Sequence, residues 1–131
     1  MKKNDASILI IDDDADVRKS VALLLAANGF SSVETANGAV EGVKKALAGK
    51  YDLILLDMIM PRVSGWGVLE KLSAKKLRTR VLVLSAVGLP EVVGDEVRKR
   101  YPKVGFLPKT SAAAELAGRI AEALKSPAGA I

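Results

Sequence analysis

Four short apolar runs in this chain each lead to a polar residue, and this pattern constrains the fold more than any other feature. The runs are 8–11, 53–56, 81–84 and, more weakly, 104–107. Uncharged runs of this length, flanked by residues that break secondary structure, are typical of strands buried on both faces of a parallel sheet. Because helices cover both faces of such a sheet, the sequence predicts an α/β protein.

Helical patterns fill the intervals between these runs, and a fifth, more polar strand is expected at 32–36. Five strand–helix units with short connections predict a parallel sheet with right-handed crossovers. The polar strand is expected at an edge of the sheet, because an edge strand is less completely buried than a central one.

The helices are expected to present regularly spaced apolar residues to the sheet. Asp14 is expected to cap the first helix, which ends at 28–29, and Asn37 to cap the second, which ends at Gly49. The inward residues expected on the second helix are Val40, Val43 and Leu47. Those expected on the other four are Val17, Val21, Leu24, Leu25, Val68, Leu72, Val93, Val97, Leu116, Ile120 and Leu124.

Composition excludes several kinds of site. The chain has no cysteine and no histidine, so it offers no disulfide, no thiolate or imidazole metal ligand and no histidine general base.

The N-terminal stretch lacks the longer apolar core of a secretory signal, and no run approaches the roughly 20 apolar residues of a membrane span. We therefore expect a cytoplasmic protein with no membrane contact. One domain is expected over 1–125, followed by a flexible tail over 126–131.

The net charge is +5, and two basic clusters carry much of the positive charge. They comprise Lys75, Lys76, Arg78 and Arg80, and Arg98, Lys99, Arg100 and Lys103. Neither cluster is interleaved with several aromatic residues, which argues against a stacking surface for single-stranded nucleic acid. Solvated helix ends are the simpler interpretation, and a docking face for an acidic partner or a nucleic-acid backbone is the alternative.

Polar residues that could bind a ligand or take part in catalysis lie where the predicted strands end. They are Asp12, Asp13 and Asp14 after the first strand, Asp57 after the third, Ser85 after the fourth and Lys109 after the fifth. The carboxyl ends of parallel strands meet at one edge of a sheet, where ligands bind in open α/β folds. The sequence therefore predicts an active site at this edge.

These residue types suit phosphoryl chemistry at a metal ion. Carboxylates that converge stay ionised together only if a cation lies among them, and an all-oxygen donor set suits Mg²⁺. The Asp12–Asp13 pair would hold the metal, and Asp57 can be both a ligand and a nucleophile toward phosphorus. Lys109 and Ser85 would stabilise the phosphoryl oxygens.

Each of these residues has a simpler interpretation when taken alone. The run of three aspartates could form a turn and a helix cap, and Asp57 could merely end a strand. A serine after a strand and a surface lysine are common. Their joint occurrence at strand ends, in this order, favours a single functional site.

The chain resembles the receiver domain of two-component response regulators over nearly its full length, and four stretches carry the resemblance. They read ILIIDDDADVRKSV, YDLILLDMIMPRVSGWGVLEKL, VLVLSA and GFLPK. The resemblance implies a doubly wound (βα)₅ fold of the flavodoxin-like or CheY-like kind, with a five-stranded parallel sheet of order 2-1-3-4-5.

The same resemblance assigns roles to individual residues. The acidic pair is Asp12 and Asp13, with Asp13 expected to touch Mg²⁺ (or Mn²⁺) directly. Asp57 is the phosphoacceptor and a further metal ligand, and the backbone carbonyl of Ile59 completes the protein ligands. The resemblance also makes Ser85 the switch hydroxyl, Phe106 the switch aromatic and Lys109 the phosphate-binding lysine.

The function implied is a signalling switch, which catalyses only its own phosphorylation and slow autodephosphorylation. It would take a phosphoryl group from the phosphohistidine of a histidine kinase or a phosphotransfer domain. It would then signal through the 90–125 face to an output domain or a second copy, without direct binding to nucleic acid. Two alternatives stay open on the same fold: a phosphatase with an aspartate nucleophile and an interaction module that is independent of phosphorylation.

One position departs from the family pattern. Thr110 follows Lys109, where the family usually has proline, often after a cis peptide bond. Because a cis bond before a residue other than proline costs about 2.5–4 kcal/mol, we expect a trans bond here.

Overall fold

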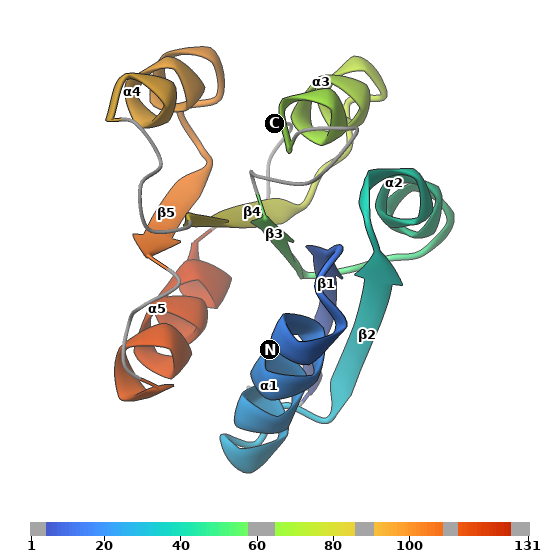
Figure 1. Ribbon diagram of the computed structural model, residues 1–131, viewed down its shortest axis with the longest axis vertical. Helices are drawn as coiled ribbons and strands as arrows, with labels where there is room; N and C mark the ends of the chain where they lie inside the picture. Colours follow the sequence, from blue (N-terminus) through green and yellow to red (C-terminus); the bar gives the residue numbers. More distant parts are fainter. Residues whose placement is uncertain (1–4, 58–64, 86–90, 109–112, 127–131) are drawn as a thin grey trace.

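The computed structural model describes residues 5–57, 65–85, 91–108 and 113–126. Within these ranges the chain alternates strands and helices, and the helices cover both faces of one sheet (Figure 1). In chain order the elements are β1 (Ser7–Asp12), α1 (Ala15–Ala27), β2 (Ser32–Asn37), α2 (Ala39–Ala48), β3 (Leu53–Asp57), α3 (Gly65–Ala74), β4 (Arg80–Ser85), α4 (Glu91–Arg100), β5 (Gly105–Pro108) and α5 (Ala113–Lys125).

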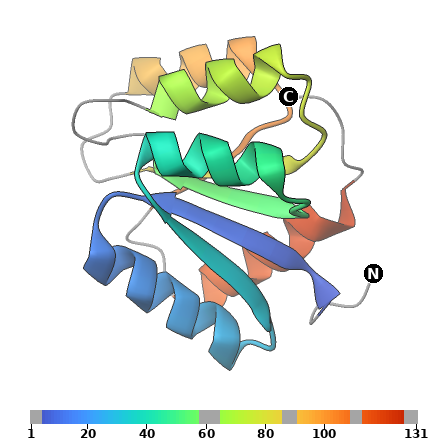
Figure 2. The same ribbon diagram turned by 90° about the vertical axis from the view of Figure 1, so that its right-hand side faces the viewer.

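The five strands are parallel and lie in the order β2-β1-β3-β4-β5. Helices α2, α3 and α4 cover one face of the sheet, and α1 and α5 cover the other (Figures 1 and 2). This arrangement confirms the predicted α/β class, the doubly wound architecture and the strand order. It also confirms that the polar strand β2 is at an edge.

Alternate residues of the central strands pack toward opposite faces of the sheet, as the pleat of a β-strand requires. In β1, Leu9 and Ile11 belong to the core beneath α2, α3 and α4, whereas Ile8 and Ile10 belong to the core beneath α1 and α5. All four side chains are fully buried, at 0–1% exposure. The two-sided burial explains why the strands read as continuous apolar runs and not as alternating patterns.

The first helix forms as the sequence predicts. The Asp14 side chain accepts hydrogen bonds from the backbone N–H groups of Asp16 and Val17, so it caps α1. The helix is followed by Asn28 and by Gly29, whose φ of 89° is readily adopted by glycine.

The prediction for α2 is wrong in its cap and in part of its inward face. Asn37 is the last residue of β2, and the N-cap is Gly38, which has a φ of 93° and no side chain to offer. Val40 is 75% exposed and Leu47 is 40% exposed, although Val43 packs against the core as expected.

Small residues face the sheet from α2 instead. Ala39, Gly42 and Ala46 are the buried residues of this helix. A Cβ atom placed on Gly42 would lie 2.6 Å from Cγ2 of Ile11, so the helix approaches β1 too closely for larger side chains. Periodicity alone favours valine and leucine as inward residues, and the close approach reverses that preference.

The last strand is shifted by one residue from the predicted run. β5 spans Gly105–Pro108, and Val104 is buried just before it.

The side chain of Val93 lies outside the described residues, as do the Lys109–Thr110 bond and residues 127–131 of the predicted tail. None of the helices in the described part of the chain is both long enough and apolar enough to span a bilayer.

Candidate functional site

Three aspartates converge at the carboxyl ends of the two central strands β1 and β3. Asp12 ends β1 and Asp57 ends β3, and the pairing of Ile11 with Leu56 brings these ends side by side. One carboxylate oxygen from each of Asp12, Asp13 and Asp57 lies within 4.8 Å of the other two. The structure therefore brings together the three carboxylates that the sequence predicts.

Burial distinguishes the members of this acidic cluster. Asp12 and Asp57 are only 1% and 2% exposed, whereas Asp13 is half-buried. Two buried carboxylates beside a third lose hydration and repel one another, and a divalent cation among them offsets both costs. The donors are all oxygen, so the cluster fits a hard ion such as Mg²⁺.

The run of three aspartates divides into two kinds of residue. Asp14 turns away to cap α1, and its backbone N–H donates to Oδ1 of Asp12 at 3.0 Å. The carboxylates of Asp12 and Asp13 belong to the acidic cluster, together with that of Asp57. The cap interpretation is therefore correct for one aspartate and the metal interpretation fits the other two.

The other predicted site residues are only partly described. Ser85 ends β4, and its backbone lies one residue beyond the position paired with Asp57. Its partner in β5 is Pro108, which directly precedes Lys109. The side chain of Ser85 and the whole of Ile59 and Lys109 lie outside the described residues, so their roles stay predictions.

Phe106 lies in the edge strand β5, next to Val83 of β4. Its ring is half-buried against the core, and the guanidinium of Arg98 lies 4.7 Å from the ring centroid. Arg119 of α5 donates to its backbone carbonyl at 3.1 Å. The predicted switch aromatic is therefore contacted from both α4 and α5.

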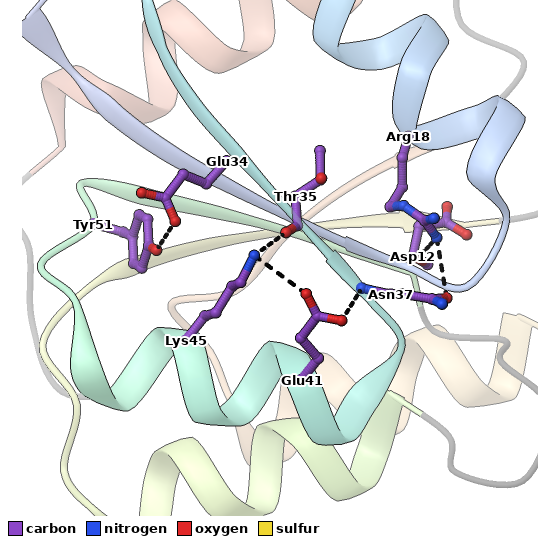
Figure 3. A network of polar contacts seen from close by, with 8 residues as sticks. All are labelled: Asp12, Arg18, Glu34, Thr35, Asn37, Glu41, Lys45 and Tyr51. Carbon is purple, nitrogen blue, oxygen red and sulfur yellow. Dashed lines mark hydrogen bonds and ion pairs between the residues drawn. The ribbon is translucent and has the colours of Figure 1, made fainter.

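Arg18 is a site-adjacent residue that the sequence interpretation misses. Its Nη1 donates to the backbone carbonyl of Asp12 at 2.7 Å and to Oδ1 of Asn37 at 3.2 Å (Figure 3). A signal was present in the sequence: the cap at Asp14 puts residue 18 one turn along the helix. Side chains on a helix lean toward its N-terminus, which here faces the strand ends.

Comparison with known proteins decides the family. Residues 8–121 match the sequence model described as the response regulator receiver domain. The chain belongs to this family. It is similar to chemotaxis protein CheY of Treponema pallidum, with 33% identity over 88 residues that cover 66% of this chain and 61% of CheY. It is also similar to the transcriptional regulatory protein ResD of Bacillus subtilis, with 36% identity over 85 residues.

The ResD match covers 65% of this chain but only 35% of ResD, so the chain spans less than two thirds of either relative. Solved receiver structures resemble it over more of their length. FixJ-N matches with a TM-score of 0.81 and 28% identity, covering 95% of this chain and 96% of that one. A CheY-like receiver from Methanospirillum hungatei JF-1 matches with a TM-score of 0.80 and 25% identity, covering 91% and 93%.

Aromatic and basic side chains connect α3 and α4 of the receiver. The guanidinium of Arg100 lies 5.4 Å from the ring centroid of Trp66 and 5.6 Å from that of Tyr101. It also lies 3.7 Å from a carboxylate oxygen of Glu70. Trp66 is partly buried against the core, which agrees with the packing role expected of a tryptophan.

A cavity of about 690 Å³ lies at the other end of the receiver's sheet, beside the start of β4 and β5. Its described lining includes none of the predicted site residues. The lining consists of Arg78, Thr79, Arg80, Val81, Leu82, Lys103, Gly105, Arg119, Glu122, Ala123 and Ser126. The acidic cluster, at the carboxyl ends of β1 and β3, therefore remains the candidate for phosphoryl chemistry.

Proposed function

We propose that this receiver domain accepts a phosphoryl group on Asp57 and changes conformation in response. The observation that carries the proposal is the convergence of Asp12, Asp13 and Asp57 within 4.8 Å at the ends of adjacent strands. A buried carboxylate beside two others suits a metal-assisted nucleophile, because a divalent cation would offset the repulsion between the three charges.

The residues that would hold Mg²⁺ (or Mn²⁺) are the three aspartates together with the backbone carbonyl of Ile59. When bound, the ion would neutralise negative charge on the phosphoryl oxygens as the group is transferred. Asp13 is the member expected to touch the ion directly, and its greater exposure leaves room for the water that Mg²⁺ usually retains.

The transfer itself exchanges one bond to phosphorus for another. A carboxylate oxygen of Asp57 forms the new O–P bond while the N–P bond of the donor phosphohistidine breaks. Ser85, which ends β4, and Lys109, which follows β5 in the sequence, would contact the phosphoryl oxygens. The donor would be a histidine kinase or a phosphotransfer domain, and the chain would act as a switch and not as a classical enzyme.

The proposed output surface is formed by α4, β5 and α5, over residues 90–125. Phe106 lies within it, contacted by Arg98 from α4 and by Arg119 from α5. A phosphoryl group that draws in Ser85 would alter the space available to Phe106 and so change this surface. An output domain or a second copy of the chain would read the change.

The phosphatase alternative loses its main support in the structure. Phosphatases with an aspartate nucleophile generally have two aspartates, separated by one residue, after the first strand. Asp12 and Asp14 fit that spacing, but Asp14 caps α1 through its side chain. Asp57 would then have no role, although it is almost fully buried beside Asp12 and Asp13.

Intact-mass analysis after incubation with acetyl phosphate and Mg²⁺ tests the proposal. We expect the wild-type chain to gain the mass of one phosphoryl group, and Asp57→Asn to gain none. Asp14→Asn is the matched control, because asparagine caps a helix as well as aspartate does. It should label like the wild type. Labelling that persists in Asp57→Asn, or that is unaffected by a chelator, would contradict the proposal.

A further inference from the structure

Arg18 contacts the acidic cluster through a backbone carbonyl. Its Nη1 lies 2.7 Å from the carbonyl oxygen of Asp12 and 3.2 Å from Oδ1 of Asn37 (Figure 3). Asp12 and Asn37 are the last paired residues of β1 and β2. The half-buried guanidinium therefore joins the two strands where they end, beside the predicted metal site.

The Asn37 end of this connection is itself held by α2. The backbone N–H of Asn37 donates to Oε2 of Glu41 at 3.2 Å. Lys45 lies 3.2 Å from Oε1 of Glu41 and donates to the backbone carbonyl of Thr35 at 2.6 Å. A continuous set of contacts thus runs from Asp12 through α1 and β2 to α2, and we call its five residues the strand-end brace: Arg18, Asn37, Glu41, Lys45 and Thr35 (Figure 3).

The brace acts on the segment that directs the carboxylates. The carbonyl of Asp12 belongs to the peptide that links Asp12 to Asp13, so a donor that fixes this carbonyl fixes the orientation of both residues. Both hydrogen bonds come from Nη1, whose two N–H bonds lie in the plane of the guanidinium and point in two fixed directions, whereas the three N–H bonds of an ammonium rotate freely. Groups that orient metal ligands without touching the metal typically change metal affinity by 10- to 100-fold when removed.

We propose that Arg18 is a positioning residue for the acidic pair: it holds the Asp12–Asp13 peptide so that both carboxylates point into the metal site. This inference rests on the proposed function, which makes the acidic cluster a Mg²⁺ site. It goes further by giving a role to a residue that neither binds the metal nor contacts the phosphoryl group.

A purely electrostatic role for Arg18 would have the opposite consequence. A fixed positive charge near three carboxylates competes with a divalent cation, so its removal would strengthen Mg²⁺ binding. Removal of a positioning contact weakens binding. The sign of the change in Mg²⁺ affinity therefore distinguishes the two roles.

Calorimetric titration with Mg²⁺ measures that sign. We expect Arg18→Gln to raise the dissociation constant about tenfold. Arg18→Lys keeps the charge, but its rotating donors hold the two acceptors less rigidly, so it should raise the constant by a smaller factor. Asn37→Ala, which changes no charge, should raise it as well. Lys19→Gln is the control, because Lys19 is the exposed neighbour and the charge change is the same.

A second measurement keeps the inference testable without metal. The backbone N–H of Asp14 donates to Oδ1 of Asp12, so its hydrogen-exchange rate reports whether Asp12 is held in place. Exchange should be faster in Arg18→Gln and Arg18→Lys than in the wild type and in Lys19→Gln, with folding of each variant checked by circular dichroism.

The outcomes separate this inference from the proposed function. If the wild type fails to bind Mg²⁺, the proposed function is wrong. The exchange rate at Asp14 is then the measurement that tests whether Arg18 holds Asp12 in place. If the wild type binds Mg²⁺ and Arg18→Gln binds it as tightly or more tightly, Arg18 does not position the pair. Unchanged exchange at Asp14 would also overturn the inference.

Discussion

The two edges of the receiver's sheet are held by different sets of contacts. At the β2 edge, charged side chains donate directly to backbone carbonyls: Arg18 to Asp12 at 2.7 Å and Lys45 to Thr35 at 2.6 Å. At the β5 edge, Arg119 donates to the backbone carbonyl of Phe106 at 3.1 Å, and the guanidinium of Arg98 lies over the Phe106 ring, 4.7 Å from its centroid. Both edges thus have a hydrogen bond from a charged side chain to the backbone, and the β5 edge adds a contact with the face of an aromatic side chain.

This difference predicts where the receiver can move. A hydrogen bond weakens steeply when its angle or distance changes, whereas a guanidinium can slide across a ring face and keep much of its attraction. The β2 edge, next to the acidic pair, should therefore stay rigid. The Phe106 side chain at the β5 edge can rearrange at smaller cost, which suits the surface that we propose to signal.

The largest expected effect on the free energy of unfolding comes from a substitution that crowds the contact between α2 and β1. Gly42→Val would put side-chain atoms where even a Cβ lies 2.6 Å from Ile11, which is fully buried. We expect the free energy of unfolding to fall by about 1–3 kcal/mol, as is typical of overpacked cores. Urea unfolding measures the change.

Gly118→Ala in α5 is the matched control, because no atom beyond the neighbouring residues and backbone of its own helix lies within 4 Å of a Cβ at that position. Alanine is a better helix former than glycine, so this variant should gain about 0.5–1 kcal/mol. A loss of stability in Gly118→Ala, or none in Gly42→Val, would show that the β2 edge is not the more tightly packed one.

A smaller, pH-dependent effect is expected at Glu41. The hydrogen bond from the Asn37 N–H lowers the pKa of Glu41 below 4.5, and Lys45 lowers it further. A lowered pKa in the folded state stabilises the fold above the unfolded pKa, and this contribution is lost as the pH falls through the folded pKa. Glu41→Gln should therefore be less stable than the wild type at pH 7, and the difference should vanish in acid.

Thermal unfolding of both proteins at pH 7 and at about pH 3 measures this difference. Glu96→Gln, an exposed change on α4 that removes the same charge, is the control. A Glu41→Gln variant that loses the same stability at both pH values would show that its carboxylate does not stabilise the brace through its charge.

The residue pattern was sufficient to predict the strands and the acidic cluster, and the resemblance to receiver domains supplied the strand order. Apolar runs buried on two faces leave a strong pattern, and Asp12 and Asp57 stand directly at the ends of such runs. The inward face of α2 was harder to predict because close packing selects Gly42 over valine or leucine, and no periodicity shows how near a helix lies to its sheet.

The contacts of the brace could not be predicted for a different reason. Arg18 bonds to a backbone carbonyl in one strand and to Asn37 in another, and no spacing in the sequence encodes such a pairing. Asn37 was expected to cap α2, but it ends β2 and bonds to both Arg18 and Glu41 instead. Polar residues with several possible partners are resolved only by the tertiary structure.

NMR shift mapping with beryllofluoride and Mg²⁺ tests the central claim most directly, because beryllofluoride stands in for the phosphoryl group on Asp57. We expect backbone shifts over 95–108, including Phe106, and little change over 32–48 beyond the residues that touch the site. Shifts confined to the surroundings of Asp57, or shifts over 32–48 as large as those over 95–108, would contradict the account of a rigid β2 edge and a responsive β5 edge.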